Sequence, residues 1–207
     1  MRNELHGLLN KVTDANLDPI AHQIGSLAIA VEQTDDADIL DAFVRIIYQH
    51  ASLDTLHTSI YVAICQRILD KLEKERDRWR KVELYHLGNP VHCFETSLQS
   101  RCQEVFEAIL DKGDAAVLCT FAGFVGGLLA DTLLFPTHVE GMVGALFKGA
   151  VHDVNGSLSA LCRFLAPVIA SFKATELLNS LAIDERAQTA LVETETHSPR
   201  VWFTMKV

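Results

Sequence analysis

The 207-residue sequence has few of the features that mark catalytic, secreted or strand-rich proteins. It contains no G-x-x-x-x-G-K-[ST], G-x-G-x-x-G, H-E-x-x-H or G-x-S-x-G motif, so no phosphate loop, dinucleotide site, zinc-protease helix or serine nucleophile is predicted. Its five cysteines form no C-x-x-C pair, and their odd number favours a reduced, intracellular protein over a disulfide scaffold. The N-terminus has no apolar signal region, and alternating strand patterns are scarce. We therefore expect a non-enzymatic helical protein without a cofactor.

The sequence also has few positively charged residues. It contains 18 Lys and Arg and 27 Asp and Glu, which gives a net charge of −9. Binding along a nucleic acid backbone draws its affinity from Lys and Arg that displace counterions, so this balance argues against it. A local basic patch remains compatible with the composition.

The longest uncharged segment is too short for a membrane span. Residues 115–130 carry no charge and include Gly123 and Gly127 in a G-x-x-x-G pair. This run falls below the roughly 20 residues that a bilayer requires, and Asp131 and Pro136 follow it closely. A helix that is apolar all round is usually interior, so a buried core helix and a cytoplasmic protein are predicted.

Helical periodicity recurs along most of the chain. Phe94, Leu98, Cys102, Phe106 and Ile109 form one apolar stripe. Similar stripes are predicted at Leu40, Phe43, Val44 and Ile47, at Ile60, Ile64, Ile68 and Leu72, and at Leu158, Leu161, Cys162 and Leu165 after Ser157 as a candidate N-cap. Breakers such as Asp18-Pro19, Gly88-Asn89-Pro90, Lys112-Gly113-Asp114 and Phe135-Pro136 leave about nine or ten helices of roughly 10–18 residues. Short connectors make neighbours antiparallel, which fits either a bundle or a solenoid.

Six segments in order resemble one known family. They are Leu9-Asn10-Lys11-Val12-Thr13, Tyr61 to Cys65, Phe94 to Glu107, Phe124 to Leu134, Ser157 to Leu165, and Ser198 to Phe203. The most specific, Phe94 to Glu107, is similar to F-x-x-x-L-x-x-R-C-Q-x-x-F-E. Together they resemble the middle domain of eukaryotic translation initiation factor 4 gamma, a HEAT-type domain. Departures include Thr120-Phe121-Ala122-Gly123, where the family has Gly-Asn-Ile-Lys, and the absence of a long charged insertion.

The resemblance implies both a fold and a function. It implies a right-handed α-solenoid of about five antiparallel helical hairpins, with residues 1–207 as a single domain excised from a longer protein. It also implies a scaffold in translation initiation that binds a DEAD-box RNA helicase of initiation factor 4A type, with further initiation-factor and mRNA contacts. The alternative is an RNA-binding module, or an adaptor of the poly(A)-binding-protein interactor type, in mRNA metabolism.

The residues that would contact a partner have two interpretations each. They are Asn10, Lys11, Arg101, Gln103, Glu104, Arg200 and Trp202. Exposed Trp and Arg are common interface anchors, which favours contact. Against this, Asn10 can cap a helix end, Arg101, Gln103 and Glu104 can form an ion-pair network between hairpins, and Trp202 can pack as core.

The candidate RNA-binding segment lies between Lys71 and Lys81. It combines stacking and charged side chains, of which Lys74, Arg76, Arg78, Trp79, Arg80 and Lys81 are the candidates. Three interleaved acids favour an ordinary solvated helix face. His86, His92, Cys93 and Cys102 form the only Cys/His cluster, but their spacing matches no usual zinc pattern, so no metal is predicted.

Overall fold

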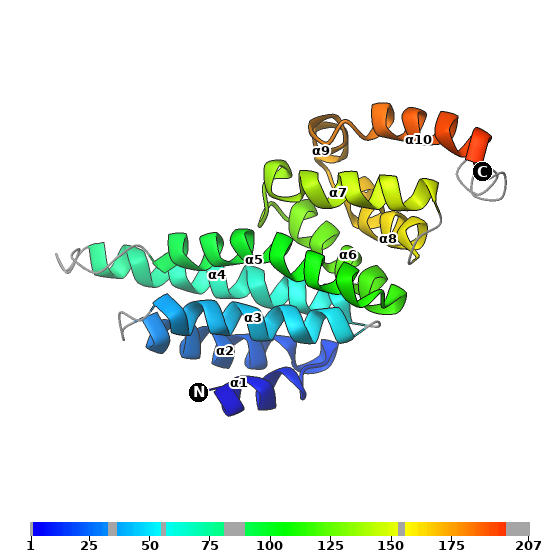
Figure 1. The fold of residues 1–207 in the computed structure, drawn as a ribbon. Coiled ribbons are helices and arrows are strands. Elements are labelled where there is room, and N and C mark those ends of the chain that lie inside the picture. The colour runs from blue at the N-terminus through cyan, green and yellow to red at the C-terminus, as the bar shows by residue number, and fades with distance from the viewer. Residues whose placement is uncertain (1, 33–36, 55–56, 81–89, 153–155, 198–207) are drawn as a thin grey trace.

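The computed structural model describes residues 2–32, 37–54, 57–80, 90–152 and 156–197 (Figure 1). The side chains of residues 32, 37–38, 40, 76–80, 90–93, 191 and 193–197 lie outside this description. All regular structure in the described ranges is helical, which confirms the predicted all-α class. The helices are α1 (Arg2–Leu9), the 3-10 turn η1 (Asp14–Asn16), α2 (Leu17–Glu32), α3 (Ala37–Leu53), α4 (Thr58–Arg80), α5 (Pro90–Lys112), α6 (Ala115–Ala130), α7 (Pro136–Val151), α8 (Ser157–Ala170), α9 (Ala174–Ser180) and α10 (Ile183–His197).

The helices form two stacked rows. One row runs through α1, α3, α5 and α7, and the other runs through α2, α4, α6 and α8, with each helix packed on the next of its row. The helices α1 and α2, α3 and α4, α5 and α6, α7 and α8, and α9 and α10 also contact each other, so the chain builds five successive pairs (Figure 1). This arrangement agrees with the predicted stack of about five hairpins, and its right-handed sense stays a prediction.

The fifth pair departs from the regular alternation. Helix α9 packs on α8, and α10 returns to α7, so the two helices have exchanged rows. Only residues 171–173 separate α8 from α9, fewer than in the other connections from the second row to the first. Ser171 also donates a hydrogen bond to the carbonyl oxygen of Ala130 at 3.3 Å. Ser171 is thereby held at the end of α6, and α9 begins three residues later and packs on α8.

Helix α6 is the uncharged segment of the sequence, and it lies at the centre of the stack. It packs on α3, α4, α5 and α8, and most of its side chains are buried. Asp114 caps its N-terminus by accepting hydrogen bonds from the backbone N–H groups of Ala116 and Val117, at 3.0 and 3.1 Å. The prediction of a buried core helix over residues 115–130 is confirmed. Among the helices of the described ranges, none has the length and apolarity needed to cross a bilayer.

Three local predictions were wrong. Asp18 and Pro19 lie in the first turn of α2, where proline is tolerated because the first N–H groups of a helix have no partner inside it. Ser157 begins α8, and the N-cap is Gly156, whose φ of +70° suits glycine. Cys162 is exposed, because α8 buries the face that carries Leu161, Phe164 and Val168.

Candidate functional site

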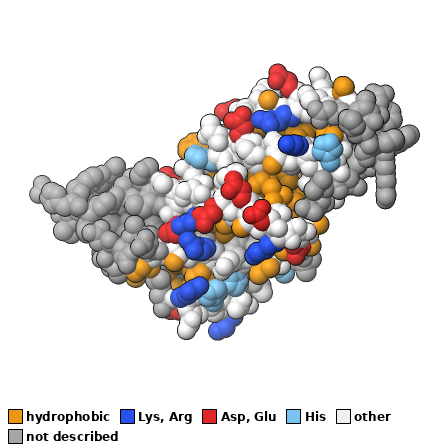
Figure 2. Space-filling view, viewed as in Figure 1, with side chains coloured by type: hydrophobic (Ala, Val, Ile, Leu, Met, Phe, Trp, Pro, Cys, Tyr) orange, Lys and Arg blue, Asp and Glu red, His pale blue; other side chains and the backbone are white. Residues whose placement is uncertain are grey.

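A groove crosses the first row of helices from the end of α1 to the start of α6. Its volume is about 1180 Å³. We call it the α1–α3–α5 groove. Figure 2 shows Lys, Arg and His side chains on this face of the molecule, with Asp and Glu side chains among them. Its lining includes apolar side chains (Leu9, Val12, Leu53, Val105, Ile109, Val117) and polar ones (His6, Asn10, Arg45, His50, Asp54, His57, Arg101, Glu104, Lys112, Asp114).

Arg101 ties the two central helices of the groove together. From α5, its Nε and Nη2 atoms donate to the two carboxylate oxygens of Asp41 on α3, each at 2.5 Å. Its Nη1 atom donates to Glu104 one turn further along α5. Hydrogen bonds from Arg101 to Asp41 and then Glu104 raise the pKa of the guanidinium above its already high value, so the side chain stays charged. A bidentate arginine–carboxylate pair of this kind fixes the spacing of α3 and α5.

The predicted partner-contact residues fall partly into this groove. Asn10, Arg101 and Glu104 line it together, although the first lies in the turn after α1 and the others lie on α5. Lys11 is exposed beside Asn10, and its carbonyl oxygen accepts a hydrogen bond from the Asn16 side chain at 2.9 Å. Arg101 thus forms the ion-pair network of one interpretation and also lines the groove, and its contact with a partner stays a prediction.

Gln103 lies on a different face of α5. Its side-chain amide donates to Glu107 at 2.7 Å and lies against Gly141 of α7. Successive helical residues are about 100° apart, so a residue two positions from Arg101 points roughly 200° away from it. Arg200 and Trp202 lie outside the described residues.

A histidine pair joins α1 to α3 inside the groove. His6 Nδ1 and His50 Nε2 are 2.8 Å apart, and the two rings are tilted with their centroids 5.1 Å apart. These residues are 44 positions apart in the sequence. No local spacing motif could have indicated this pair, because only the packing of α1 on α3 brings the rings together.

A second polar cluster borders the same groove where α3 ends and α4 begins. The Asp54 carboxylate contacts His57 Nδ1 at 3.1 Å and accepts a hydrogen bond from the Tyr61 hydroxyl at 3.3 Å. Burial, followed by the Asp54 charge, raises the pKa of Tyr61 to about 12. Tyr61 therefore remains a neutral donor at physiological pH, and Asp54 is engaged inside the protein.

Acidification should loosen the attachment of α1. Burial and then His6 lower the pKa of His50 below its ordinary value, while Asp54 acts in the opposite direction. The unfolded chain takes up this proton near pH 6.5, whereas the folded chain resists it. Stability from the pair is therefore present above about pH 6.5 and is lost as the pH falls through the lower folded pKa. We expect a loss of less than about 1 kcal/mol, because the pair is only partly buried.

The measurement is urea unfolding at pH 7.5 and pH 5.5 for the native chain and His50→Gln. Glutamine can hydrogen-bond but does not titrate, so the pH difference should shrink. His22→Gln on the exposed face of α2 serves as the control. An unchanged pH difference in His50→Gln would contradict the assignment.

The candidate RNA-binding residues lie on and beyond the end of α4. Lys74 is exposed on this helix. The side chains of Arg76, Arg78, Trp79 and Arg80, and the whole of Lys81, lie outside the described residues. Lys71, at the start of the basic segment, donates to the carbonyl oxygen of His22 at 2.8 Å and to Ser26 Oγ at 2.6 Å. This lysine is therefore used in packing α2 against α4.

Of the Cys/His cluster in the sequence, the structure describes only the side chain of Cys102, which is a buried thiol. Cys102 is fully buried, and burial raises its pKa to about 12, as it does for Cys65. Such thiols stay protonated and unreactive. Among the described residues no group of His, Cys, Asp and Glu has the arrangement of a metal site. His86, His92 and Cys93 lie outside that description.

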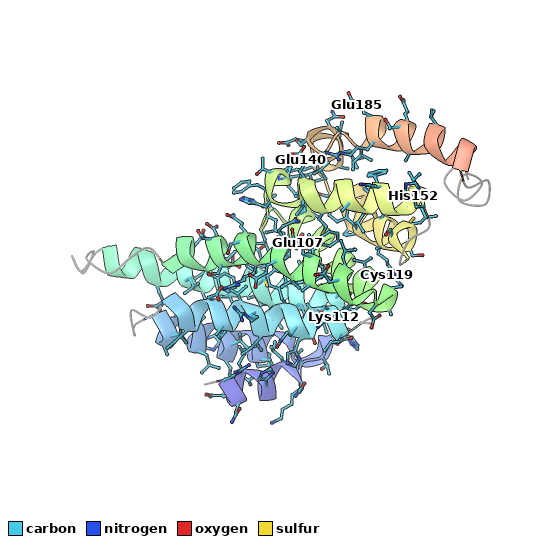
Figure 3. All side chains as sticks on the ribbon, in the orientation of Figure 1. Glu107, Lys112, Cys119, Glu140, His152 and Glu185 are labelled. Atoms are coloured by element: carbon cyan, nitrogen blue, oxygen red, sulfur yellow. The ribbon has the colours of Figure 1, made fainter. Side chains whose placement is uncertain are left out.

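A second groove lies on the other row, between α4, α6 and α8. Its volume is about 1230 Å³, and its lining includes Gly123, Gly127 and Pro167. Cys119, labelled in Figure 3, also lies there, and Phe172 at the rim is 89% exposed. None of the predicted site residues lines this groove.

Comparison with known proteins gives a distant relative and no family assignment. No family model matches the chain. The sequence is similar to eukaryotic translation initiation factor 4 gamma from Schizosaccharomyces pombe, with 24% identity over 201 residues. That alignment covers 85% of this chain and 14% of the relative, so the chain spans a small part of that protein's length. The resemblance inferred from the six motifs is thereby supported at the level of a distant, partial similarity to a translation initiation factor.

Proposed function

We propose that this chain is a non-catalytic scaffold domain that acts in translation initiation in the cytoplasm. In this proposal the α1–α3–α5 groove binds a DEAD-box RNA helicase of initiation factor 4A type. The observation that carries the proposal is the meeting of Asn10, Arg101 and Glu104 in one groove with an apolar lining. Distant similarity to an initiation factor supports a role in translation initiation, and the choice of a helicase as the partner follows from the resemblance of the six motifs.

The fold suits a scaffold for a physical reason. Helices α1, α3 and α5 are linked by the His6–His50 contact and the Arg101–Asp41 pair, so the groove is held at a fixed width. A rigid surface stimulates a partner only if it contacts one conformation of that partner better than another. The expected activity is therefore a change in the helicase's ATPase rate with no chemistry performed by this chain.

Leu53 provides a direct test of the groove. It is a large apolar side chain that is 72% exposed in the groove lining. Leu53→Asp should weaken binding to the purified helicase about 10–30-fold, the loss typical of a central apolar anchor. Affinity is measured by titration calorimetry, and ATPase stimulation should fall in parallel.

Val192 on α10 offers a matched control. It is also aliphatic and 68% exposed, but it does not line the groove. Val192→Asp should keep the native affinity, and both variants should unfold at the native temperature because surface substitutions cost little. Equal loss in both variants, or none in Leu53→Asp, would count against the groove, while absence of any helicase binding would reject the proposed partner.

A further inference from the structure

The second groove combines an exposed aromatic ring with a hollow of apolar side chains. We call it the α4–α6–α8 groove, after the helices that line it. Phe172 follows Ser171, which is hydrogen-bonded to the carbonyl oxygen of Ala130, so the ring lies at the end of the groove where α6 ends. The ammonium of Lys173 lies 5.7 Å from the centroid of the same ring, and this lysine does not line the groove. The ring is therefore presented to solvent at one end of an apolar hollow.

The apolar lining of this groove is made mostly of small residues. A Cβ at Gly123 on α6 would lie 3.9 Å from Cβ of Arg163 on α8, which places that arginine beside this glycine. The other small lining residues are Gly127, Ala63, Ala116, Cys119, Ala130, Ala166 and Ala170. A large side chain from another molecule can therefore approach the helix backbones closely. An aromatic ring gains the most from such a site, because it buries a large apolar area.

The groove lining contains one acid and one base, and they lie apart. Asp131 follows the end of α6, whereas Arg163 lies beside Gly123, eight residues earlier and about 12 Å away along the helix axis. Both residues are exposed, and neither side chain has an ion pair or a hydrogen bond among the described residues. The carbonyl groups at the end of α6 add negative potential around Asp131. The groove is thus negative at one end and positive further along.

These features are complementary to themselves. A twofold axis through the middle of the groove, near Gly127, would exchange its two ends. It would bring Asp131 and Phe172 of each copy to Arg163 of the other copy. A guanidinium can pair with a carboxylate and also lie over an aromatic ring. An interface of this isologous kind uses the same patch on both copies, so the chain itself supplies every group that the groove requires.

We propose that the α4–α6–α8 groove binds the same groove of a second copy of this chain. The dimer contains two pairs between Arg163 of one copy and Asp131 of the other, and it buries the Phe172 ring of each copy in the groove of its partner. No residue lines both this groove and the α1–α3–α5 groove. The inference is therefore independent of the proposed function, which uses a different surface.

Sedimentation velocity of the purified chain tests the dimer directly. Over roughly 1–200 μM protein, the weight-average mass should rise from 22.9 kDa toward twice that value. The buffer contains about 0.15 M salt, where a Debye length of about 8 Å screens the repulsion between two copies that each carry a net charge of −9.

Phe172→Ala removes the ring from both halves of the interface. It should raise the dissociation constant of the dimer about tenfold or more, the loss typical of an aromatic anchor. Phe135→Ala is the matched control, because this ring is 60% exposed but does not line the groove. Phe135→Ala should leave the dissociation constant within about twofold of native.

Charge reversal tests the pairing between the copies. Arg163→Glu alone brings two carboxylates together at each contact, and Asp131→Lys alone brings two cations together, so each should raise the dissociation constant about tenfold. An equal mixture of the two variants should dimerise, because every contact then joins opposite charges, and this recovery also shows that both variants fold. Lys148→Glu changes the net charge as Arg163→Glu does, but Lys148 is exposed on α7 outside the groove, so dimerisation should persist.

Three results would overturn the proposal. They are a monomer at every concentration, a dimer that neither Phe172→Ala nor the charge reversals weaken, and mixed variants that associate no better than each variant alone. Assembly beyond a dimer would reject the twofold arrangement, because an isologous interface closes at two copies. None of these results bears on helicase binding, which the Leu53→Asp titration tests separately.

Discussion

Replacing Gly126 with alanine should be the most damaging glycine-to-alanine change among the described helical glycines. A Cβ at this position would lie 2.2 Å from the carbonyl oxygen of Phe164 and 3.0 Å from Cγ of Pro167, both on α8. The obstacle is mainly backbone, so no side-chain rotation relieves it, and α6 and α8 must move apart. Overpacking of a rigid core costs about 1–3 kcal/mol or more, and the upper end applies here. We expect Gly126→Ala to lower the free energy of unfolding by about 3 kcal/mol and the melting temperature by roughly 6–12 °C.

Gly123→Ala on the same helix is the matched control. Its Cβ would lie 3.8 Å from the nearest atom of α8, the carbonyl oxygen of Arg163, which is an ordinary contact. Alanine is favoured over glycine in a helix interior by about 0.8–1.0 kcal/mol, so this variant should be neutral or more stable. Urea unfolding followed by circular dichroism measures both. Similar stabilities for the two variants would show that α6 and α8 are not in close backbone contact at Gly126.

Periodicity predicted the helices of this fold well because burial decides helix faces. Ile60, Ile64, Ile68 and Leu72 are all buried, as are Phe94, Leu98, Cys102, Phe106 and Ile109. The stripe on α8 was placed on the wrong face at Cys162, since that short helix carries apolar residues on both sides. The exchange of rows by α9 and α10 depends on tertiary packing, which a periodic pattern does not encode.

The candidate site was only partly predictable for a related reason. A motif indicates which residues are unusual, whereas a groove depends on which helices become neighbours. Arg101 and Glu104 share a helix face by their spacing, and Gln103 could have been separated from them by the same rule. His6, His50 and Asp54 belong to no sequence motif. These side chains meet only when α1 packs on α3, so their proximity could not be predicted from local spacing.

The pair between Arg101 and Asp41 should carry the largest stabilising contribution among the described ion pairs. Each side chain is 23% exposed, and the bidentate contact joins two helices through residues that are 60 positions apart in the sequence. Removing one partner leaves the other charge partly buried with weaker compensation, which costs more than the net value of the pair. Arg101→Gln should therefore lower the free energy of unfolding by about 2 kcal/mol. The same change should widen the α1–α3–α5 groove and lower the affinity for a partner that binds there.

A double-mutant cycle with Asp41→Asn separates the pair from its surroundings. If the two residues act mainly on each other, the double variant should be little less stable than either single variant, with a coupling of about 1–2 kcal/mol. Arg186 provides the comparison, because its pair with Glu140 is a single contact at 3.3 Å with Glu140 61% exposed, and a pair of that kind contributes about 0–1 kcal/mol. Arg101→Lys adds a further arm, since lysine keeps the charge but loses the planar fork, and it should recover only part of the stability. Full recovery by lysine would mean that the charge matters and the bidentate geometry does not. Additive losses in the cycle would mean that Arg101 and Asp41 do not stabilise the protein through each other.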